Sequence, residues 1–322
     1  MTLLIIPASF NVLSTREKKT IYVDDDNTSG PWDGTIEHPY QYIQDGIDAA
    51  ENKDTVFVET GEYNENLRIT KDISLIGNNK EETIVSSIDS SEFLILDTLN
   101  NVNFLNFTFS CKTEERFDVI KMINCTFCTI SNIDILSESL QRSALIVNGS
   151  HNTIMNVYIN GRFVYAGLEV FYSNYNTIKN NTIDSTGAGI LVFRSYNNII
   201  ESNKINNNTN GLYIEEANQN LIIGNLIQDN NRGLFSSYSI KNIIENNNFI
   251  ENDEQAKFTK LLMKDFISPN YWNNNYWNDH NGLLIKPIPG VVYIPNRHLI
   301  GFFLPWVEFD WHPAKEPYDI AA

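Results

Sequence analysis

The chain has 322 residues, of which 42% are hydrophobic and 20% are charged, a composition that excludes a largely disordered protein. Its formal net charge is −17. This charge argues against nucleic acids and anionic membranes as partners, because their phosphates would be repelled. No apolar run approaches the roughly 18 residues that a membrane-spanning helix needs, so no membrane span is expected.

The N-terminal segment, "MTLLIIPASFNVLST", has a short apolar stretch but lacks the basic region of a secretory signal. We interpret residues 1–19 as a leader or truncated signal segment, with a disordered leader or a first strand as alternatives. Residues 20–54 are predicted to form an N-terminal cap that contains a short amphipathic helix. Ile43, Ile47 and Ala50 share one face of that helix and would cover the first turn of the following domain.

An acidic cluster, "DDDN", lies within this predicted cap. Its carboxylates belong to Asp24, Asp25 and Asp26, and carboxylates gathered in a loop suit calcium. A solvated acidic turn is the alternative. Calcium is therefore the one cation for which the sequence offers candidate ligands.

Residues 55–252 contain an internal repeat, which has a period of 22 residues from Asn176 onward and is degenerate in the earlier coils. It is marked by two asparagine columns, one isoleucine column and one glycine column. The columns are Asn176, Asn198, Asn220 and Asn242; Asn181, Asn203, Asn225 and Asn247; Ile178, Ile200, Ile222 and Ile244; and Gly189, Gly211 and Gly233. Short apolar strands alternate within each repeat, and this predicts an all-β, single-stranded parallel β-helix with three strands per coil and coils stacked at roughly 4.8 Å.

The asparagines of the repeat have a structural interpretation. Stacked side-chain amides hydrogen-bond along a column, so Asn181, Asn203, Asn225 and Asn247 are predicted to form an asparagine ladder. These residues also stand between two closely spaced strands, where a tight turn needs the left-handed backbone conformation that asparagine tolerates. Residues 253–322 break the repeat and are predicted to form an aromatic C-terminal cap and an extended tail.

The cysteines and histidines give no strong metal signal. Three cysteines, Cys111, Cys125 and Cys128, are an odd number, which argues against a disulfide framework; an oxidised pair of Cys125 and Cys128 is the alternative to buried thiols. Copper requires clustered His, Met or Cys ligands, whereas the histidines are scattered. They are His38, His151, His280, His298 and His312. We therefore expect no cofactor, with calcium as the alternative.

Three stretches carry a family resemblance: the repeat itself, the segment "TIYVDDDNTSGPWDGTIEHPYQYIQDGIDAAENKDTVFVETGEYNENLRITKDISLIG", and the segment "NYWNNNYWNDHNG". Over residues 20–280 they resemble the right-handed parallel β-helix repeats of the pectin-lyase-like superfamily. The most similar group is the NosD-like one, often labelled periplasmic copper-binding. The resemblance implies an archaeal or bacterial secreted protein. It implies no single activity, since this fold hosts lyases, hydrolases, epimerases and adhesins.

The resemblance also implies where a ligand would bind, because enzymatic relatives hold substrate along the strand that follows the repeat glycine. Alternation along this strand predicts two outward columns. The first column is Glu169, Leu191, Tyr213 and Phe235, and the second is Phe171, Phe193, Glu215 and Ser237. We predict that Phe171, Phe193, Tyr213 and Phe235 bind carbohydrate by apolar contact with sugar rings. Ordinary stacking between neighbouring coils is the alternative.

The catalytic candidates are Glu169, Arg194 and Glu215. Two coils and two residues separate the glutamates, which places their Cα atoms about 12 Å apart. An inverting glycosidase requires about 6.5–9.5 Å between carboxyl groups, so the fit is poor. The polygalacturonase-like N-T-D, D-D and G-H-G motifs are also missing, and Arg194 and Arg232 lack the flanking aspartates of a pectate-lyase-like site.

The sequence therefore predicts a secreted or cell-surface β-helix protein, periplasmic in a bacterium, that binds carbohydrate or has a structural or adhesive role without catalysis. The alternative is a carbohydrate-active enzyme, a polysaccharide lyase, hydrolase or epimerase, that acts on the face after the repeat glycine. The expected partner is a glycan or another cell-surface polymer, and self-association is a further expectation.

Overall fold

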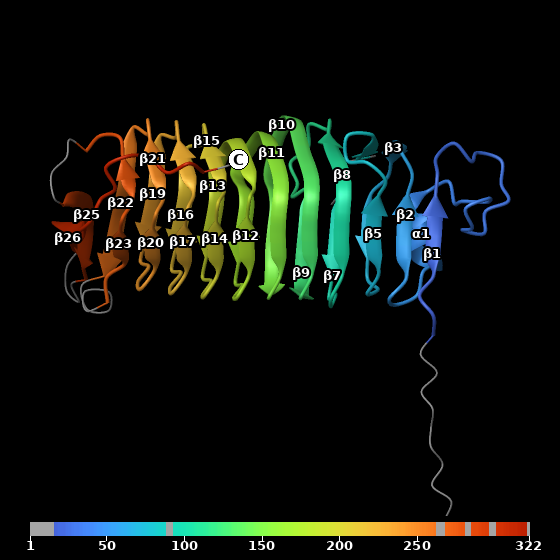
Figure 1. The fold of residues 1–322 in the computed structure, drawn as a ribbon, viewed down its shortest axis with the longest axis horizontal. Helices are drawn as coiled ribbons and strands as arrows, with labels where there is room; N and C mark the ends of the chain where they lie inside the picture. The colour runs from blue at the N-terminus through green and yellow to red at the C-terminus, as the bar shows by residue number, and fades with distance from the viewer. Residues whose placement is uncertain (1–15, 88–92, 262–267, 281–284, 296–300, 321–322) are drawn as a thin grey trace, which may run out of the picture.

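The computed structural model describes residues 16–87, 93–261, 268–280, 285–295 and 301–320. They form an elongated stack of coils whose strands run across the long axis (Figure 1). Most of the predicted leader, residues 1–15, lies outside the described residues, as does His298. Within the described residues, no helix has the length and apolar character needed to span a membrane.

Three faces of parallel strands build the stack, and each coil contributes one strand to each face. The first face contains β1 (Thr20–Val23), β2 (Thr55–Val58), β5 (Ser74–Gly77), β12 (Thr177–Lys179), β14 (Ile199–Glu201), β17 (Leu221–Ile223), β20 (Ile243–Glu245) and β23 (Tyr271–Asn273). The second face contains β3 (Gly61–Asn64), β6 (Thr83–Ser86), β15 (Lys204–Asn206), β18 (Leu226–Gln228), β21 (Asn248–Ile250) and β24 (Tyr276–Trp277). The third face contains β4 (Leu67–Ile69), β7 (Leu94–Asp97), β9 (Ile120–Thr126), β16 (Asn210–Glu215), β19 (Arg232–Ser237), β22 (Glu254–Leu261) and β25 (Lys286–Ile294).

Longer strands in the middle of the chain continue around the corners from one face to the next. They are β8 (Asn103–Cys111) on the first two faces, β10 (Thr129–Ser150) and β11 (Thr153–Phe171) on all three, and β13 (Thr182–Phe193) on the second and third. The final strand, β26 (Phe302–Asp310), is antiparallel to β25. Every other pairing between these strands is parallel, so the described residues form a parallel β-helix, as predicted.

The repeat columns stack in register. Ile178 pairs with Ile200, which pairs with Ile222, and the isoleucine side chains are fully buried. Four apolar residues of one coil, Ile178, Ile183, Ile190 and Val192, all have 0% exposure. Stacking therefore buries an apolar core that no single coil would bury alone, which is the physical reason for the repeat.

The predicted asparagine ladder is confirmed. The Asn203 side-chain Nδ2–H donates to Asn225 Oδ1 at 2.9 Å, and the Asn203 backbone N–H donates to the same oxygen at 2.9 Å. The Asn176, Asn198, Asn220 and Asn242 column forms a second ladder of the same kind. A third ladder, which the sequence analysis missed, contains Asn208, Asn230 and Asn252.

The backbone conformation of the ladder corrects one expectation. The left-handed conformation is adopted by the residue before each ladder asparagine, as at Asn180 (φ 54°), Ser202 (φ 55°) and Asn246 (φ 56°). The physical reason is that two consecutive residues have different roles at the corner. One residue turns the chain while the next points its amide into the stack, where it caps backbone groups such as the Ile178 carbonyl.

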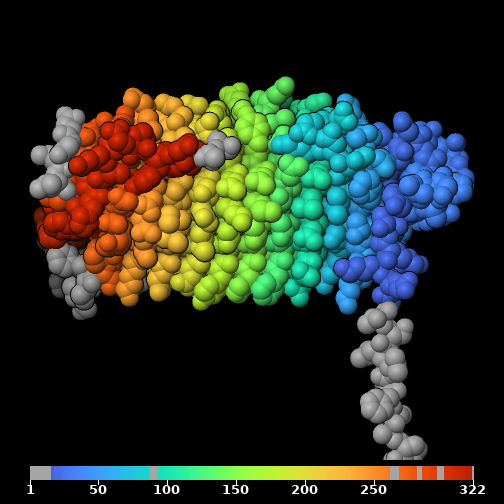
Figure 2. All heavy atoms as spheres, viewed as in Figure 1, coloured from blue at the N-terminus to red at the C-terminus, as the bar shows by residue number. Residues whose placement is uncertain are grey.

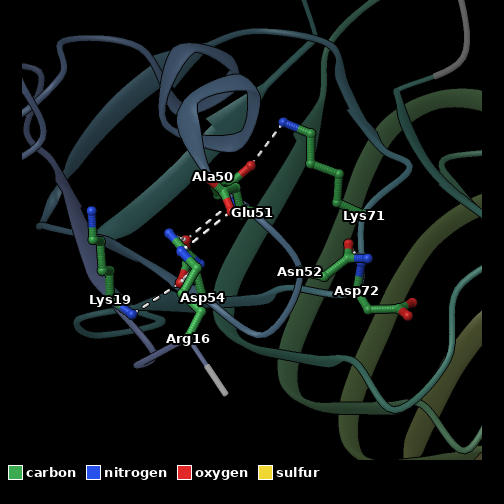
Figure 3. A network of polar contacts seen from close by, with 8 residues as sticks. All are labelled: Arg16, Lys19, Ala50, Glu51, Asn52, Asp54, Lys71 and Asp72. Carbon is green, nitrogen blue, oxygen red and sulfur yellow. Dashed lines mark hydrogen bonds and ion pairs between the residues drawn. The ribbon is translucent and has the colours of Figure 1, made fainter. Parts of the chain in front are cut away.

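At the N-terminal end, helix α1 (Ile43–Ala49) packs against the first coil, with Ile43 and Ile47 buried. The loop after this helix is held by Asp54, whose carboxylate accepts hydrogen bonds from the Arg16 guanidinium and from the Lys19 and Glu51 backbone N–H groups (Figure 3). Burial of Asp54 opposes its ionisation, but these hydrogen bonds prevail and lower its pKa to about 2.

At the C-terminal end, the aromatic residues divide into two groups. Trp272 and Trp277 are buried, and the Trp277 ring stacks on Phe249 with centroids 4.2 Å apart. Trp306 and Trp311 are exposed. The tail after β26 then returns across the outside of earlier coils (Figure 2), where Tyr318 donates its hydroxyl to the Asn274 carbonyl at 2.7 Å.

Candidate functional site

The outer surface of the third face was the predicted ligand site, and the repeat glycine determines which side chains reach it. A Cβ on Gly189 would point into the core, 2.4 Å from Ile205 Cγ2, and the next residue, Ile190, is also fully buried. Two consecutive residues therefore face inward at the glycine. Beyond it, alternation resumes. Phe193 is half-buried, whereas Leu191 is only 2% exposed and packs in a small apolar cluster with Ala166 and Ala188, against which Phe193 and Tyr213 also pack.

The four predicted aromatic residues form two stacked pairs. The rings of Phe171 and Phe193 lie 5.6 Å apart at 10°, and those of Tyr213 and Phe235 lie 5.2 Å apart at 17°. All four side chains are half-buried. Because each ring uses a face against its partner, the pairs turn mainly ring edges outward. Ring edges carry partial positive charge and favour contact with oxygen atoms.

Glu169 lies on this face but is only 3% exposed. The Ser143 hydroxyl donates a hydrogen bond to its Oε2 at 3.3 Å. Burial raises the pKa of Glu169 to about 6, the negative charge of Asp118 adds to the rise, and the positive charge of Arg142 partly offsets it. A carboxyl group that changes charge near neutral pH is suited to proton transfer.

The repeat is irregular in the coils next to Glu169. Ladder partners are 24 residues apart at Asn152 and Asn176, 22 apart from Asn176 to Asn242, and 28 apart from Asn242 to Asn270. The extra residues appear as register shifts in β10 and β11, at the corners before the third face. Tyr165 belongs to one of these irregular corners and Arg142 to the other.

Tyr165 lies within electrostatic reach of both candidate glutamates. Its pKa is raised by burial and then by the negative charges of Glu169 and Glu215, while Arg142 lowers it. Its side chain is about half exposed. The two glutamates themselves lie two coils apart, Glu169 in register with Leu191 and Glu215 in register with Phe193.

Asp118 is a site residue that the sequence analysis missed. It is 2% exposed, and its carboxylate lies 3.2 Å from Arg142 Nε and 3.3 Å from Lys121 Nζ. Its Oδ1 faces Arg142 without forming a hydrogen bond of good geometry. No repeat signal marks Asp118, because the coil it belongs to is degenerate.

Glu215 and Tyr213 complete the surface. Glu215 is partly exposed, and burial together with its neighbouring charge raises the pKa of Tyr213 to about 12. Tyr213 therefore remains a neutral hydrogen-bonding group at all physiological pH values.

Arg194 does not join the carboxylates. It turns the chain at a corner with φ 46° and its guanidinium binds both carboxylate oxygens of Glu216, at 2.7 and 3.2 Å. A further N–H donates to the Tyr172 hydroxyl, and the guanidinium lies 5.0 Å from the Phe193 ring centroid. The left-handed turn at Arg194, which alternation does not predict, directs its side chain toward the corner. Arg194 therefore covers an aromatic ring of the site, with its charge paired to Glu216.

The acidic cluster near the N-terminus is engaged in local structure. Asp24 Oδ1 accepts the Asp26 N–H, and Asp25 Oδ2 accepts the Glu62 N–H. Asp24 and Asp26 line a cavity of about 180 Å³ together with Glu59. Across the described ranges, no three His, Cys, Asp or Glu side chains are placed to hold a metal ion.

The histidine and cysteine positions do not fit a copper site either. His151 is stacked between the rings of Phe127 and Tyr175, and His312 contacts Asn273. The three cysteines are buried in the core. In the part of the chain that the structure describes, the ligand types that copper prefers are not gathered.

The fold and the stacked asparagine ladders define a right-handed parallel β-helix of the pectin-lyase-like type. A family model described as "Periplasmic copper-binding protein (NosD)" matches residues 100–282, more than half of the chain. The protein therefore belongs to the NosD family. No match was found among curated proteins.

Several solved structures share the fold at low sequence identity. They include an exopolygalacturonase from Thermotoga maritima, with a TM-score of 0.55 and 10% identity over 83% of this chain and 91% of that one. The pectate lyase Pel9A has a TM-score of 0.52 and 12% sequence identity, and the match covers 84% of this chain and 80% of that one. The catalytic domain of a GH87 α-1,3-glucanase in complex with nigerose has a TM-score of 0.52 and 14% sequence identity, and the match covers 75% of this chain and 46% of that one. At these identities the likeness establishes the fold alone.

Proposed function

We propose that this protein binds a carbohydrate polymer along the third face of its β-helix. The observation that carries the proposal is the pair of aromatic stacks, Phe171 with Phe193 and Tyr213 with Phe235. They lie on four successive coils, which at roughly 4.8 Å per coil gives a path of about 15 Å. The second pair is displaced by two residues along the strand, so the path runs diagonally over the face.

The groups beside the rings suit an oxygen-rich ligand. Ring edges attract hydroxyl oxygens, the Tyr165 and Tyr213 hydroxyl groups remain neutral, and Glu215 accepts hydrogen bonds. Two arginines stabilise the rings: Arg194 lies over Phe193, and Arg232 lies 4.6 Å from the Phe235 centroid. This mixture of apolar surface and fixed polar groups is typical of small-ligand and sugar sites.

Electrostatics favour a neutral polymer over an acidic one. The net charge of −17 opposes binding of a polyanion. The positive charges on the face are already neutralised, since Arg232 and Lys257 both pair with Glu254. We therefore infer a neutral polysaccharide as the ligand.

The comparisons support this proposal without deciding it. The solved structures that share the fold are named for acting on, or are solved with, carbohydrates. The description of the family as periplasmic supports a location outside the cytoplasm, where polysaccharides are encountered. A structural or adhesive role at the cell surface would use the same binding face.

Affinity gel electrophoresis tests the proposal. The protein is run through native gels that contain neutral glucans, xylan or mannan, with alginate and pectin as acidic comparators. We expect retardation by at least one neutral polysaccharide, and about tenfold weaker binding for Phe193→Ala and Phe235→Ala, since each loses a ring contact of roughly 1–2 kcal/mol. Phe127→Ala is the matched control, because it removes an exposed ring on another corner.

Two results would contradict the proposal. One is unchanged migration of the wild-type protein in every gel. The other is equal weakening by Phe127→Ala and Phe193→Ala, since binding would then not depend on the third face.

A further inference from the structure

We propose that a cavity at the C-terminal end of the third face binds the terminal sugar unit of the polymer, so that the protein recognises chain ends. This inference rests on the proposed binding function and names the part of the neutral polysaccharide that is recognised. The cavity has a volume of about 210 Å³ and lies between the first residues of β22 and those of β25, near one end of the stack (Figure 1).

The cavity exists because β25 stands away from β22 at its start. β22 pairs with β19 from Glu254 onward, but its pairing with β25 begins only at Phe258. Pro287 and Pro289 occupy the first part of β25, and proline has no N–H group to donate to a neighbouring strand. The two strands therefore enclose space beside the first half of β22 instead of forming a ladder there.

Two columns of the repeat change residue type at this place. The repeat glycine of the preceding coil, Gly233, is followed in register by Gln255, and the buried Leu234 is followed by Ala256. A Cβ on Gly233 would lie 2.4 Å from the Gln255 carbonyl oxygen, so a side chain in this column requires that the next strand stand away. Gln255 is therefore compatible only with a separated β25, and the small Ala256 leaves volume unfilled beneath it.

The cavity has a buried apolar floor and a polar rim. Trp277 and Ile288 are each 1% exposed and form the floor with Ala256, whereas Asp253 and Pro287 are exposed at the rim. An apolar floor suits the C–H face of a sugar ring, and a carboxylate at the rim accepts hydrogen bonds from hydroxyl groups. Pockets for drug-sized ligands have volumes of about 300–1,000 Å³, so this smaller cavity suits one sugar ring.

The positive charge in the cavity is balanced, which favours a neutral ligand over an acidic one. Lys286 Nζ lies 2.7 Å from both carboxylate oxygens of Asp279, and the Lys286 side chain is 12% exposed. An ammonium group has three N–H bonds, so Lys286 retains a donor for a sugar hydroxyl after its charge is paired. The ion pair also holds this donor in one place, which reduces the entropy lost on binding.

A chain of contacts connects the cavity to the aromatic path. The Arg232 guanidinium lies 4.6 Å from the Phe235 ring centroid, and its Nε is 2.7 Å from Oε2 of Glu254, which lines the cavity. Glu254 is in register with Arg232, so the cavity begins one coil beyond the last ring of the path. The distance is roughly 4.8 Å, which a polymer spans with its next sugar unit.

The direction of the path also leads to the cavity. Between Phe193 and Tyr213 the path shifts by two residues toward the start of the third-face strands, and the cavity lies at the start of β22. Residues 286–289 of β25 form its far wall. A polymer that follows the rings therefore meets a closed end, which accepts a chain terminus and blocks a continuing chain.

Titration calorimetry with linear glucan, xylan and mannan oligosaccharides of two lengths tests this inference. Both lengths cover the roughly 15 Å path and reach the cavity, and the longer is several times the length of the shorter. Recognition of a terminus predicts one protein molecule per oligosaccharide chain at both lengths, with the same affinity per chain. Binding to chain interiors predicts a number of protein molecules per chain that rises with length, and this result would overturn the inference.

Two variants locate the binding in the cavity. Lys286→Met removes the donor and should weaken binding of the shorter oligosaccharide at least about tenfold, while Lys241→Met, at an exposed corner before β20, should match wild type. Ala256→Leu restores the leucine of the preceding coils and reduces the cavity volume. We expect it to weaken binding by a similar factor with an unchanged or raised melting temperature, a combination that loss of structure would not produce.

The outcomes distinguish this inference from the binding function. Binding that is weakened by Phe193→Ala and Phe235→Ala but unchanged in Lys286→Met and Ala256→Leu would overturn the role of the cavity and leave the binding face intact. Failure of the wild type to bind any of the oligosaccharides or their parent polymers would overturn both proposals together.

Discussion

Asn275 donates its side-chain Nδ2–H to Asp310 Oδ2 at 3.0 Å, and its backbone N–H donates to the same oxygen at 3.0 Å. The Asn181 ladder therefore ends on a carboxylate. Every amide in this ladder donates toward the C-terminal end of the stack, as from Asn247 to Asn275, so the last asparagine needs a strong acceptor. A carboxylate meets that need because charge-assisted hydrogen bonds are the stronger kind.

Replacing this acceptor should destabilise the C-terminal coils. In Asp310→Ala the buried Asn275 backbone N–H and Trp277 Nε1–H lose their acceptor, and we expect a loss of about 2–4 kcal/mol in the free energy of unfolding. Denaturant titration measures the total change in the free energy of unfolding, and hydrogen exchange should show that the loss of stability lies in the last coils. Asp319→Ala, an exposed carboxylate of the tail, is the control. Equal midpoints for the two variants would show that the ladder needs no terminal acceptor.

The middle of the ladder should be as sensitive as its end. Asn225 is fully buried, accepts from Asn203, and donates to Asn247 and to the Ile200 carbonyl. We expect Asn225→Ala to cost about 3 kcal/mol, because several buried partners are left unsatisfied at once. Asn100→Ala removes an exposed amide and should cost less than about 0.5 kcal/mol. If both variants unfold at the wild-type denaturant concentration, the ladder contributes nothing to stability.

Replacement by alanine should destabilise the protein by different amounts at Gly211 and Gly224, because Gly211 is enclosed by neighbouring atoms whereas Gly224 has a positive φ in open space. A Cβ on Gly211 would lie 2.7 Å from the Gly233 carbonyl oxygen and 2.9 Å from Ile227 Cγ2, so we expect Gly211→Ala to cost about 3 kcal/mol. Gly224 has φ +63° and open space, so Gly224→Ala should cost only about 1 kcal/mol of backbone strain. Thermal melts of the two variants provide the comparison, and a larger loss for Gly224→Ala would contradict it.

Glu169 should make stability depend on pH. Its folded pKa of about 6 exceeds the usual value of 4.5, so the folded state binds the proton more tightly than the unfolded state. The resulting stabilisation, about 2 kcal/mol, is complete below pH 4.5 and is lost as pH rises through 6. Urea titrations of the wild type and Glu169→Gln at pH 4.5 and 7.5 isolate this contribution. The variant should gain stability relative to wild type at the higher pH; parallel pH profiles would rule out the raised pKa.

The sequence was informative where the repeat is regular. The 22-residue period predicted the β-helix and one of the three ladders, and it identified the asparagine column that forms a second ladder, because each column repeats one environment. The ladder of Asn208, Asn230 and Asn252 has the same spacing and was available to the same reasoning. It was missed because the first member of that column is Thr186, which breaks the asparagine pattern.

The candidate site was less predictable, because it lies where the repeat is irregular. Alternation placed Glu169 in an outward column, but periodicity did not reveal that its side chain is only 3% exposed. Asp118 has no repeat partner that would signal its role, since its column continues as Ser143 and Ala166. The direction of the Arg194 side chain was not predicted for a related reason: the alternation of inward and outward side chains fails where the backbone is left-handed, as it is at Arg194.

Hydroxyl-radical footprinting with a bound neutral oligosaccharide tests the central claim most directly. It reports by mass spectrometry which side chains the ligand shields. We predict reduced oxidation of Tyr165, Phe193, Tyr213 and Phe235 on the third face, with no change at Tyr271 on the first face. Shielding of Tyr271 without shielding of the third-face residues would place the ligand elsewhere and contradict the account.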